Sequence, residues 1–247
     1  MNRQPCRALL LLPVCVTSAV LGTSASAQNC EARSGPKPPA VVELYTSEGC
    51  SSCPPADRWL STLKTQDGVL ALSFHVNYWN HLGWRDPFAT PETTARQYRL
   101  KEALGGKYVY TPQVVLNGRD HRGWGGQGAR DLTPLPSAAA PGLRLVREGN
   151  QVTAQLAASP AHTTLAGYWA VLQDGLVSKV TRGENAGESL RHDHVVSLYQ
   201  PVEPWPADQA HSARLNLPAG GNARVAFVVT DPGLTRPVQA LVLQCTS

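Results

Sequence analysis

Apolar residues in the first half of the chain change from short runs to a helical spacing and back. Residues 41–46 form an apolar run rich in β-branched and aromatic side chains, which is typical of a buried strand. After Pro54 and Pro55, apolar residues recur at helical spacing as far as about Gln66, and residues 69–76 are a second apolar run. Because parallel strands need a crossover of this length, the pattern predicts a strand–helix–strand unit.

Capping and turn residues predict a second helix and a hairpin. Thr90 is a good N-cap, and Gly105 can end the helix that follows it. Residues 108–122 are typical of a hairpin in which Asn117 and Gly118 form a two-residue turn.

Beyond residue 141 the pattern predicts strands alone. Residues 126–141 are rich in Gly, Pro, Ala and Ser, which indicates a linker. Eight short apolar segments follow at residues 143–146, 152–157, 167–172, 176–181, 194–199, 213–217, 225–230 and 238–243. Turn residues separate them, so an antiparallel β-sandwich-like domain is expected.

The predicted organisation is therefore an α/β domain, with a central mixed sheet flanked by helices, followed by the β-sandwich-like domain. The expected boundaries are a signal peptide at residues 1–27, an extended lead-in at 28–40, the α/β domain at 41–125, a linker at 126–141 and the β domain at 142–247.

The first 27 residues have the composition of a secretory signal peptide. Arg3 and Arg7 precede an apolar stretch at residues 8–21, and residues 25–27 are a small-residue cleavage signal. The apolar stretch is too short to cross a membrane, and no other long apolar run follows. We therefore expect an exported chain with no membrane span once the signal is removed.

The charge of the chain gives no case for a nucleic-acid partner. Removal of residues 1–27 takes away Arg3 and Arg7, so that the 22 basic residues fall to 20 against 18 acidic ones. A small positive excess without a basic run provides no electrostatic footprint for nucleic acid.

Four of the six cysteines remain after cleavage, and an even number in an exported protein implies oxidised pairs. Cys50 and Cys53 are near neighbours, which leaves Cys30 and Cys245 near the two ends of the mature chain. We interpret Cys30–Cys245 as a structural clamp, worth roughly 5 kcal/mol in the chain-entropy model. Cys50–Cys53 is then the reactive pair, and the alternative is that both pairs are inert.

Cys50 and Cys53 lie between the end of a predicted strand and the start of a predicted helix. Free N–H groups and the helix dipole favour negative charge there, and so favour a thiolate on Cys50. The order strand, Cys-x-x-Cys, helix is the redox arrangement of thioredoxin-like proteins.

Together with Thr111 and Pro112, which open a later strand, the Cys50–Cys53 pair resembles the pattern of the thioredoxin superfamily. Longer runs resemble a family of exported bacterial thioredoxin-like proteins catalogued as a domain of unknown function. These runs are residues 42–57, 74–88, 110–118 and 183–187. The resemblance implies a thioredoxin-like fold, a cis proline facing the dithiol, and a bacterial periplasmic or secreted location. It implies no established reaction.

Candidate substrate-binding residues lie in two loops. By the resemblance, Thr111 and Pro112 would orient a partner chain. Tyr78 and Trp79 belong to an aromatic loop that follows the second strand, at the sheet edge where ligands of open α/β folds bind. These two rings could contact substrate, or they could simply pack the loop onto the sheet.

Glu43 is a candidate proton shuttle. The resembling family has acidic residues where this chain has Asn77 and Asn80, which leaves Glu43 as an ionisable group within an apolar strand. Such a group has to be paired, exposed or shifted in pKa. The interpretation that we favour is a structural hydrogen bond or ion pair.

The leading functional hypothesis is thiol–disulfide exchange with the thiols or disulfides of exported proteins. Cys50 would attack and Cys53 would resolve the mixed disulfide, with no cofactor and no resident metal. One alternative is a copper or zinc metallochaperone in which the cysteines join His75 or His81. The other is a non-catalytic binding module with two structural disulfides.

Overall fold

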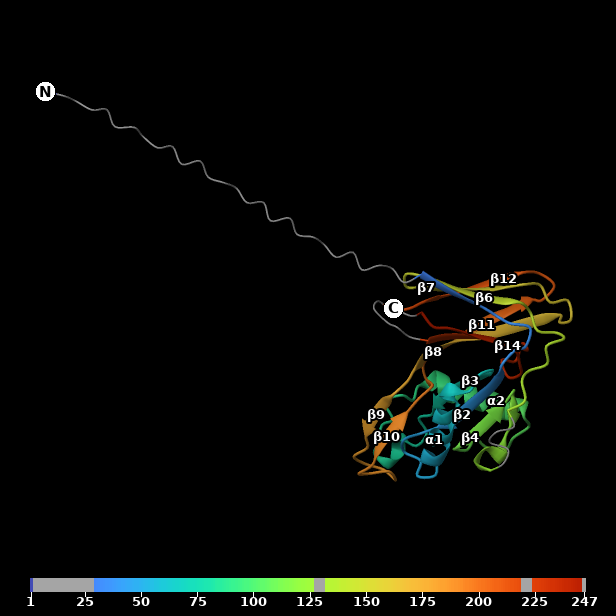
Figure 1. Cartoon of the computed structure of the whole chain (residues 1–247). Helices are drawn as coiled ribbons and strands as arrows, with labels where there is room; N and C mark the ends of the chain where they lie inside the picture. The colour runs from blue at the N-terminus through green and yellow to red at the C-terminus, as the bar shows by residue number, and fades with distance from the viewer. Residues whose placement is uncertain (2–28, 127–131, 219–223, 246–247) are drawn as a thin grey trace.

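The computed structural model of the 247-residue chain describes residues 29–126, 132–218 and 224–245, besides Met1 (Figure 1). The expected signal peptide lies outside these described residues, apart from Met1. The described part is mostly strand, with two α-helices, α1 (Pro54–Thr62) and α2 (Pro91–Ala103). The strands are β1 (Asn29–Arg33), β2 (Ala40–Thr46), β3 (Val69–His75), β4 (Gln113–Leu116), β5 (Arg119–Asp120), β6 (Leu143–Glu148), β7 (Gln151–Leu156), β8 (Thr164–Gln173), β9 (Leu176–Lys179), β10 (Ser189–His192), β11 (Val195–Pro206), β12 (His211–Asn216), β13 (Arg224–Thr230) and β14 (Pro237–Leu243).

The expected strand–helix–strand unit is confirmed. β2 and β3 pair in parallel from Ala40 opposite Val69 to Thr46 opposite His75, and α1 connects them. α1 begins at two prolines. Proline has no backbone N–H group, and none is needed in the first helical turn, because N–H groups there have no acceptor within the helix.

The second helix and the hairpin are also confirmed. The Thr90 side chain accepts a hydrogen bond from the backbone N–H of Thr93 and so caps α2. Asn117 and Gly118 connect β4 to β5 with φ angles of 51° and 77°. Positive φ at both positions is what a type I′ turn requires.

One sheet runs through both halves of the chain. Its order is β14-β13-β8-β11-β3-β2-β4-β5, so the strands that follow the predicted linker extend the sheet that contains β2 and β3. The connection is between β11 and β3, where Val195 pairs in parallel with Ser73 and the Ser73 N–H donates to the His194 carbonyl at 2.8 Å.

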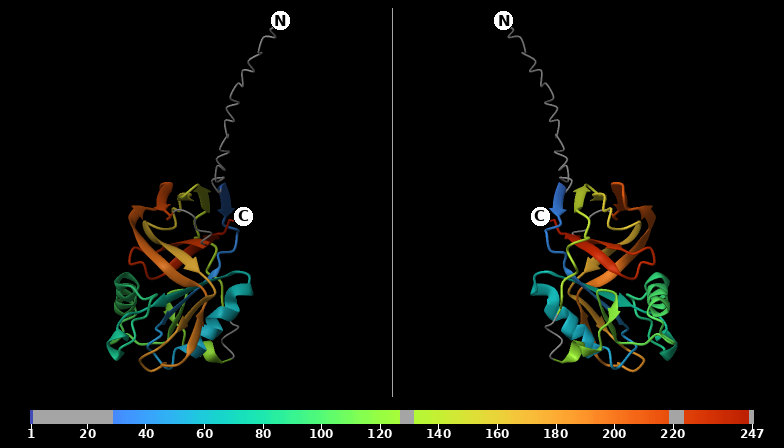
Figure 2. Two further views of the ribbon diagram at one scale, coloured as in Figure 1. Left: turned by 90° about the vertical axis from the view of Figure 1, so that its left-hand side faces the viewer. Right: turned by 90° about the vertical axis from the view of Figure 1, so that its right-hand side faces the viewer.

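A second sheet, ordered β1-β6-β7-β12, lies over the C-terminal strands of the large sheet (Figures 1 and 2). Apolar side chains of the two sheets form a shared core in which the rings of Trp169 and Phe227 lie 4.5 Å apart. The hairpin β9–β10 is a separate two-stranded sheet that lies beside α1, at the other end of the molecule.

The expected α/β domain with its own helix-flanked sheet is therefore not supported, whereas the mostly β character of the second half is. Each of the eight apolar segments coincides with a strand. Periodicity indicates where a strand lies, but it does not indicate which strand is its neighbour. The C-terminal strands occupy the edge of β3 and make the fold a mostly β structure of several sheets.

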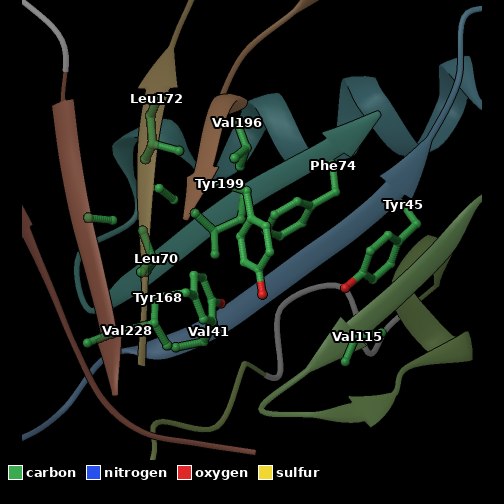
Figure 3. Close-up of a cluster of buried hydrophobic side chains, with 14 of the residues drawn as sticks. Val41, Tyr45, Leu70, Phe74, Val115, Tyr168, Leu172, Val196, Tyr199 and Val228 are labelled. Atoms are coloured by element: carbon green, nitrogen blue, oxygen red, sulfur yellow. The ribbon is translucent and has the colours of Figure 1, made fainter. Parts of the chain in front are cut away.

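The large sheet is buried on both faces. α1 packs with Ala56 and Leu60 against Val42 and Leu44 of β2. α2 contributes Leu100 to the other core, which includes Tyr45, Phe74, Tyr168 and Tyr199 (Figure 3). Successive strand residues point to opposite faces, so odd-numbered β2 residues face this second core and even-numbered ones face α1.

The expected disulfide between Cys30 and Cys245 is present, and its cysteines are 215 residues apart in the sequence. It links β1 to the segment just after β14, so both ends of the described chain are tied to the two-sheet core.

A buried ion pair joins Glu43 of β2 to Arg96 of α2. Glu43 also accepts hydrogen bonds from the hydroxyls of Tyr45 at 2.9 Å and Tyr168 at 2.7 Å. Burial opposes the charge of Arg96, but the Glu43 carboxylate outweighs this and holds the pKa of the guanidinium well above its usual value. Arg96 donates further to the carbonyl of Leu234 at 2.9 Å, so it contacts both halves of the chain.

No helix in the described part of the chain is long and apolar enough to cross a membrane.

We expect Arg96→Met to lower the free energy of unfolding by about 3–5 kcal/mol, because it leaves the Glu43 carboxylate buried without a counter-charge. The double variant Glu43→Gln/Arg96→Met removes both charges, and its free energy of unfolding should fall by clearly less. Urea denaturation of both variants measures the difference. Equal losses in the two variants would show that the charge pair is not what makes this position sensitive.

Candidate functional site

Cys50 and Cys53 form a disulfide at the start of α1, as the sequence predicts. Cys53 is the N-cap residue of the helix, and its carbonyl accepts the N–H groups of Ala56 and Asp57 at 2.9 and 3.2 Å. The side chains of Ser51 and Ser52 are exposed, but Cys50 is only 1% exposed and Cys53 is fully buried. The disulfide therefore lies under the surface of a loop whose tip is open to solvent.

The loop between β9 and β10 is bonded to the backbone of the cysteine loop. Asn185, which is buried, donates from Nδ2 to the carbonyls of Glu48 at 2.8 Å and Cys50 at 3.0 Å. Beside it, Glu184 accepts the backbone N–H of Ser51 at 2.9 Å. We call residues 183–187 the covering loop. Three hydrogen bonds hold it against the cysteine loop.

The peptide bond between Thr111 and Pro112 is cis, as the resemblance implies. Trp79 connects this bond to the cysteine loop, because its Nε1 donates to the Thr111 hydroxyl at 2.8 Å. At its other side, Trp79 lies so close to Gly49 that a Cβ on that glycine would be 2.8 Å from the Trp79 Cβ. The structure thus brings the cysteine loop, the aromatic loop and the cis proline together through one tryptophan residue.

Tyr78, the neighbour of Trp79, is bonded through Gln97 to the segment that precedes the cis proline. Its hydroxyl donates to Gln97 Oε1 at 3.1 Å, and Gln97 Nε2 donates to the Tyr110 carbonyl at 2.8 Å. Burial raises the pKa of Tyr78 to about 12, so the phenol keeps its proton at neutral pH. Tyr78 therefore fixes the segment that precedes the cis proline.

Two other predicted residues lie elsewhere. Glu43 faces the α2 side of the sheet, opposite α1, and its ion pair with Arg96 matches the structural interpretation that we favour. A role for Glu43 as a proton shuttle stays a prediction. His81 is exposed, and its Nδ1 is bonded to the Tyr78 carbonyl at 2.7 Å.

The structure adds a buried polar cluster that the sequence analysis did not assemble. It consists of Glu48, Asp57, His75, Asp86 and His192, each of them at least 93% buried. His75 Nδ1 lies 2.8 Å from Asp86 Oδ2, and His192 Nε2 lies 3.0 Å from Glu48 Oε1. Asp57 accepts a hydrogen bond from the Thr46 hydroxyl at 3.1 Å.

Burial and mutual charge shift the ionisation of this cluster. Burial raises the pKa of the Asp57 carboxyl above its usual value, against the attraction of His192 and His75. Burial alone would lower the pKa of His75, but the Asp86 carboxylate and its hydrogen bond outweigh burial and raise it. The cluster as a whole therefore favours positive charge at its centre.

The sequence carries partial signals for this cluster. Asp57 is four residues after Cys53, which is one helical turn, and Glu48 is two residues before Cys50. His192 comes from a distant segment and has no local signal. Asn77 and Asn80 have structural roles, since they are bonded to Thr94 and to the N–H of Asp86.

Comparison with known proteins identifies a family without a known reaction. The model of a family described as "Protein of unknown function (DUF1223)" matches residues 41–230. The chain is similar to the X-ray structure of protein AGR_C_4864 from Agrobacterium tumefaciens, with 31% identity and a TM-score of 0.64. That match covers 84% of this chain and 95% of the other.

A second solved structure, HBP35 of Porphyromonas gingivalis, is similar in fold, with 16% identity and a TM-score of 0.58. The match covers 85% of this chain and 76% of that one. No curated protein matches the sequence.

We expect Asn185→Ala to speed the reduction of the Cys50–Cys53 disulfide by dithiothreitol about tenfold or more. The variant loses two hydrogen bonds that hold the covering loop, each worth about 1 kcal/mol, and 1.4 kcal/mol corresponds to a factor of ten. Alkylation of free thiols, followed by mass spectrometry over time, gives the rate.

Glu184→Ala is the matched control, because it removes an exposed contact from the same loop and should change the rate by less. If Asn185→Ala is reduced at the rate of the unmodified chain, the covering loop does not limit access to the disulfide.

Proposed function

Because the chain belongs to the family described as a protein of unknown function, DUF1223, its role has to be argued from its site, and we propose thiol–disulfide exchange with exported proteins through Cys50 and Cys53. The observation that carries this proposal is a closed disulfide at the N-terminus of α1, connected by Trp79 to a cis Thr111–Pro112 bond. This local arrangement resembles thioredoxin-like proteins, although the surrounding sheet is larger.

The exchange proceeds in two balanced steps. In the oxidising direction, a partner thiolate attacks the Cys50 sulfur and forms a mixed disulfide, while Cys53 leaves as a thiolate. A second partner thiolate then attacks the partner's own sulfur and releases Cys50, so the partner is oxidised and the cysteine pair is reduced. In the reducing direction the Cys50 thiolate attacks a partner disulfide, and Cys53 resolves the mixed disulfide.

The surrounding residues have positioning roles in this proposal. Thr111 and Pro112 present backbone to a partner chain, and Trp79 fixes their distance from the cysteine loop. Tyr78 supports the same segment through Gln97. Because both cysteines are buried and the covering loop is bonded to the cysteine loop, the proposal requires the two loops to separate before a partner reaches Cys50.

The proposal also places the mature chain in an oxidising compartment, the bacterial periplasm or the medium. The signal-like residues 1–27 and the Cys30–Cys245 disulfide support this location, since structural disulfides persist where thiols are not kept reduced. The alternative of copper or zinc transfer by the cysteines has less support, because His81 is exposed and bonded to Tyr78.

We expect a reduction potential for the Cys50–Cys53 pair nearer the thioredoxin value, roughly −270 mV, than the roughly −120 mV of a strong oxidant. The helix dipole favours a thiolate, but Glu48 and Asp57 add buried acids beside the cysteines and oppose it. A glutathione redox titration with alkylation and mass spectrometry at each cysteine measures the potential.

Cys53→Ser should accumulate a mixed disulfide at Cys50 when mixed with periplasmic proteins that carry a disulfide, because the Cys50 thiolate attacks that bond and no Cys53 resolves the product, and Cys50→Ser should not. Cys30–Cys245 is expected to have a reduction potential below about −300 mV. If Cys50–Cys53 also has a potential below about −300 mV, and Cys53→Ser traps no partner, both disulfides are structural.

A further inference from the structure

We propose that Asp57, His75 and His192 form a binding site for a first-row divalent metal ion of the zinc type. The three residues come from α1, β3 and β10, which are distant in the sequence. One ligating atom of each lies within 4.8 Å of the others, and all three side chains are buried. The inference goes beyond the proposed exchange reaction, because it uses neither cysteine.

The two imidazoles are oriented as metal ligands are. His75 is bonded through Nδ1 to the Asp86 carboxylate, and His192 through Nε2 to the Glu48 carboxylate. A ring N–H that donates to a carboxylate fixes the tautomer and leaves a lone pair on the other nitrogen. Metal-binding histidines are commonly held by such carboxylates.

Each of the three residues keeps one buried polar atom without a hydrogen-bond partner. Among the described residues, Asp57 Oδ1, His75 Nε2 and His192 Nδ1 are buried and have no hydrogen-bond partner. His192 Nδ1 lies 4.0 Å from Asp57 Oδ1, and the two imidazole rings meet edge to face with centroids 4.8 Å apart. Buried polar atoms are ordinarily paired, and with both imidazoles neutral these three atoms are acceptors that a single cation could satisfy together.

The charge of the cluster favours a cation. Glu48, Asp57 and Asp86 are three buried carboxylates, and within the described residues histidines are the only basic side chains within 4.0 Å of them. With neutral imidazoles the cluster carries three negative charges in an environment where an uncompensated charge is costly. A divalent ion would cancel two of them, and the adjacent carboxylates would strengthen its ligands.

The ligand set indicates the class of metal. Two imidazole nitrogens and one carboxylate oxygen suit zinc and its transition-metal neighbours, whereas calcium and magnesium prefer oxygen alone. Tetrahedral zinc needs donors about 3.3 Å apart, as follows from bonds of about 2.0–2.1 Å. The donor atoms would therefore approach one another by about an ångström when the ion binds, and a solvent molecule would complete the coordination.

The test uses the mature chain with both disulfides formed, dialysed against EDTA and then titrated with zinc chloride in a calorimeter. We expect one zinc per chain. Asp57→Asn and His192→Asn should each weaken binding at least a hundredfold. Cobalt(II) substitution should give an absorption spectrum without a thiolate charge-transfer band.

Two controls separate this site from other zinc ligands. His81→Asn changes an exposed histidine outside the cluster, and Cys50→Ser/Cys53→Ser removes the dithiol, so both should bind zinc as the unmodified chain does. If a ligand variant fails to fold by circular dichroism in EDTA, Glu48→Gln serves instead. It leaves the ligands in place and should weaken binding tenfold to a hundredfold by loosening His192.

The proposal is overturned if the unmodified chain takes up neither zinc nor cobalt. It is equally overturned if binding survives Asp57→Asn and His192→Asn, or if binding is lost in the cysteine double variant or in His81→Asn. Retained binding in the cysteine variant would support the metal site even where the exchange reaction proved absent.

Discussion

The ion pair between Glu43 and Arg96 is the interaction on which the two halves of this molecule depend. Arg96 reaches from α2 to β2 and to the Leu234 carbonyl, and its guanidinium lies 4.2 Å from the centre of the Tyr168 ring of β8. Burying two charges is costly unless each is paired and its remaining hydrogen bonds are satisfied. Tyrosine hydroxyls satisfy the Glu43 carboxylate, and this holds only when β8 lies beside β11 and β11 beside β3. The pair therefore favours the continuous sheet over two separate domains.

The sheet divides the chemistry of the molecule by face. Glu43 and Arg96 lie with the aromatic core on one side, whereas Thr46 faces α1 on the other side and bonds to Asp57. Strand alternation produces this division, because odd and even positions of β2 cannot share a face. The Glu43–Arg96 ion pair can thus coexist with the buried polar cluster, which lies on the opposite face of the sheet.

Local patterns predicted most elements, and long-range pairing explains the rest. β2, α1, β3, α2 and the β4–β5 hairpin follow from apolar spacing, from the Thr90 cap and from the Asn117–Gly118 turn. The Cys50–Cys53 pair was likewise visible in the sequence, because its spacing is local. Two features depend on contacts between segments more than a hundred residues apart: the pairing of β3 with β11 and the approach of His192 to His75. A single sequence carries no periodic signal for such contacts.

The hairpin β9–β10 connects the two sites that have been described. Asn185, in the turn of this hairpin, donates to the Cys50 carbonyl, and His192, at the end of β10, belongs to the buried cluster. An ion held by His192, Asp57 and His75 would tie β10 to α1 and β3, so displacing the hairpin would also require breaking metal bonds. Linkage is reciprocal. If binding of the ion makes movement of β10 less favourable by a given factor, then movement of β10 lowers the affinity for the ion by the same factor. The accessibility of the disulfide and the occupancy of the cluster are therefore coupled through one structural element, provided that the hairpin moves as a unit.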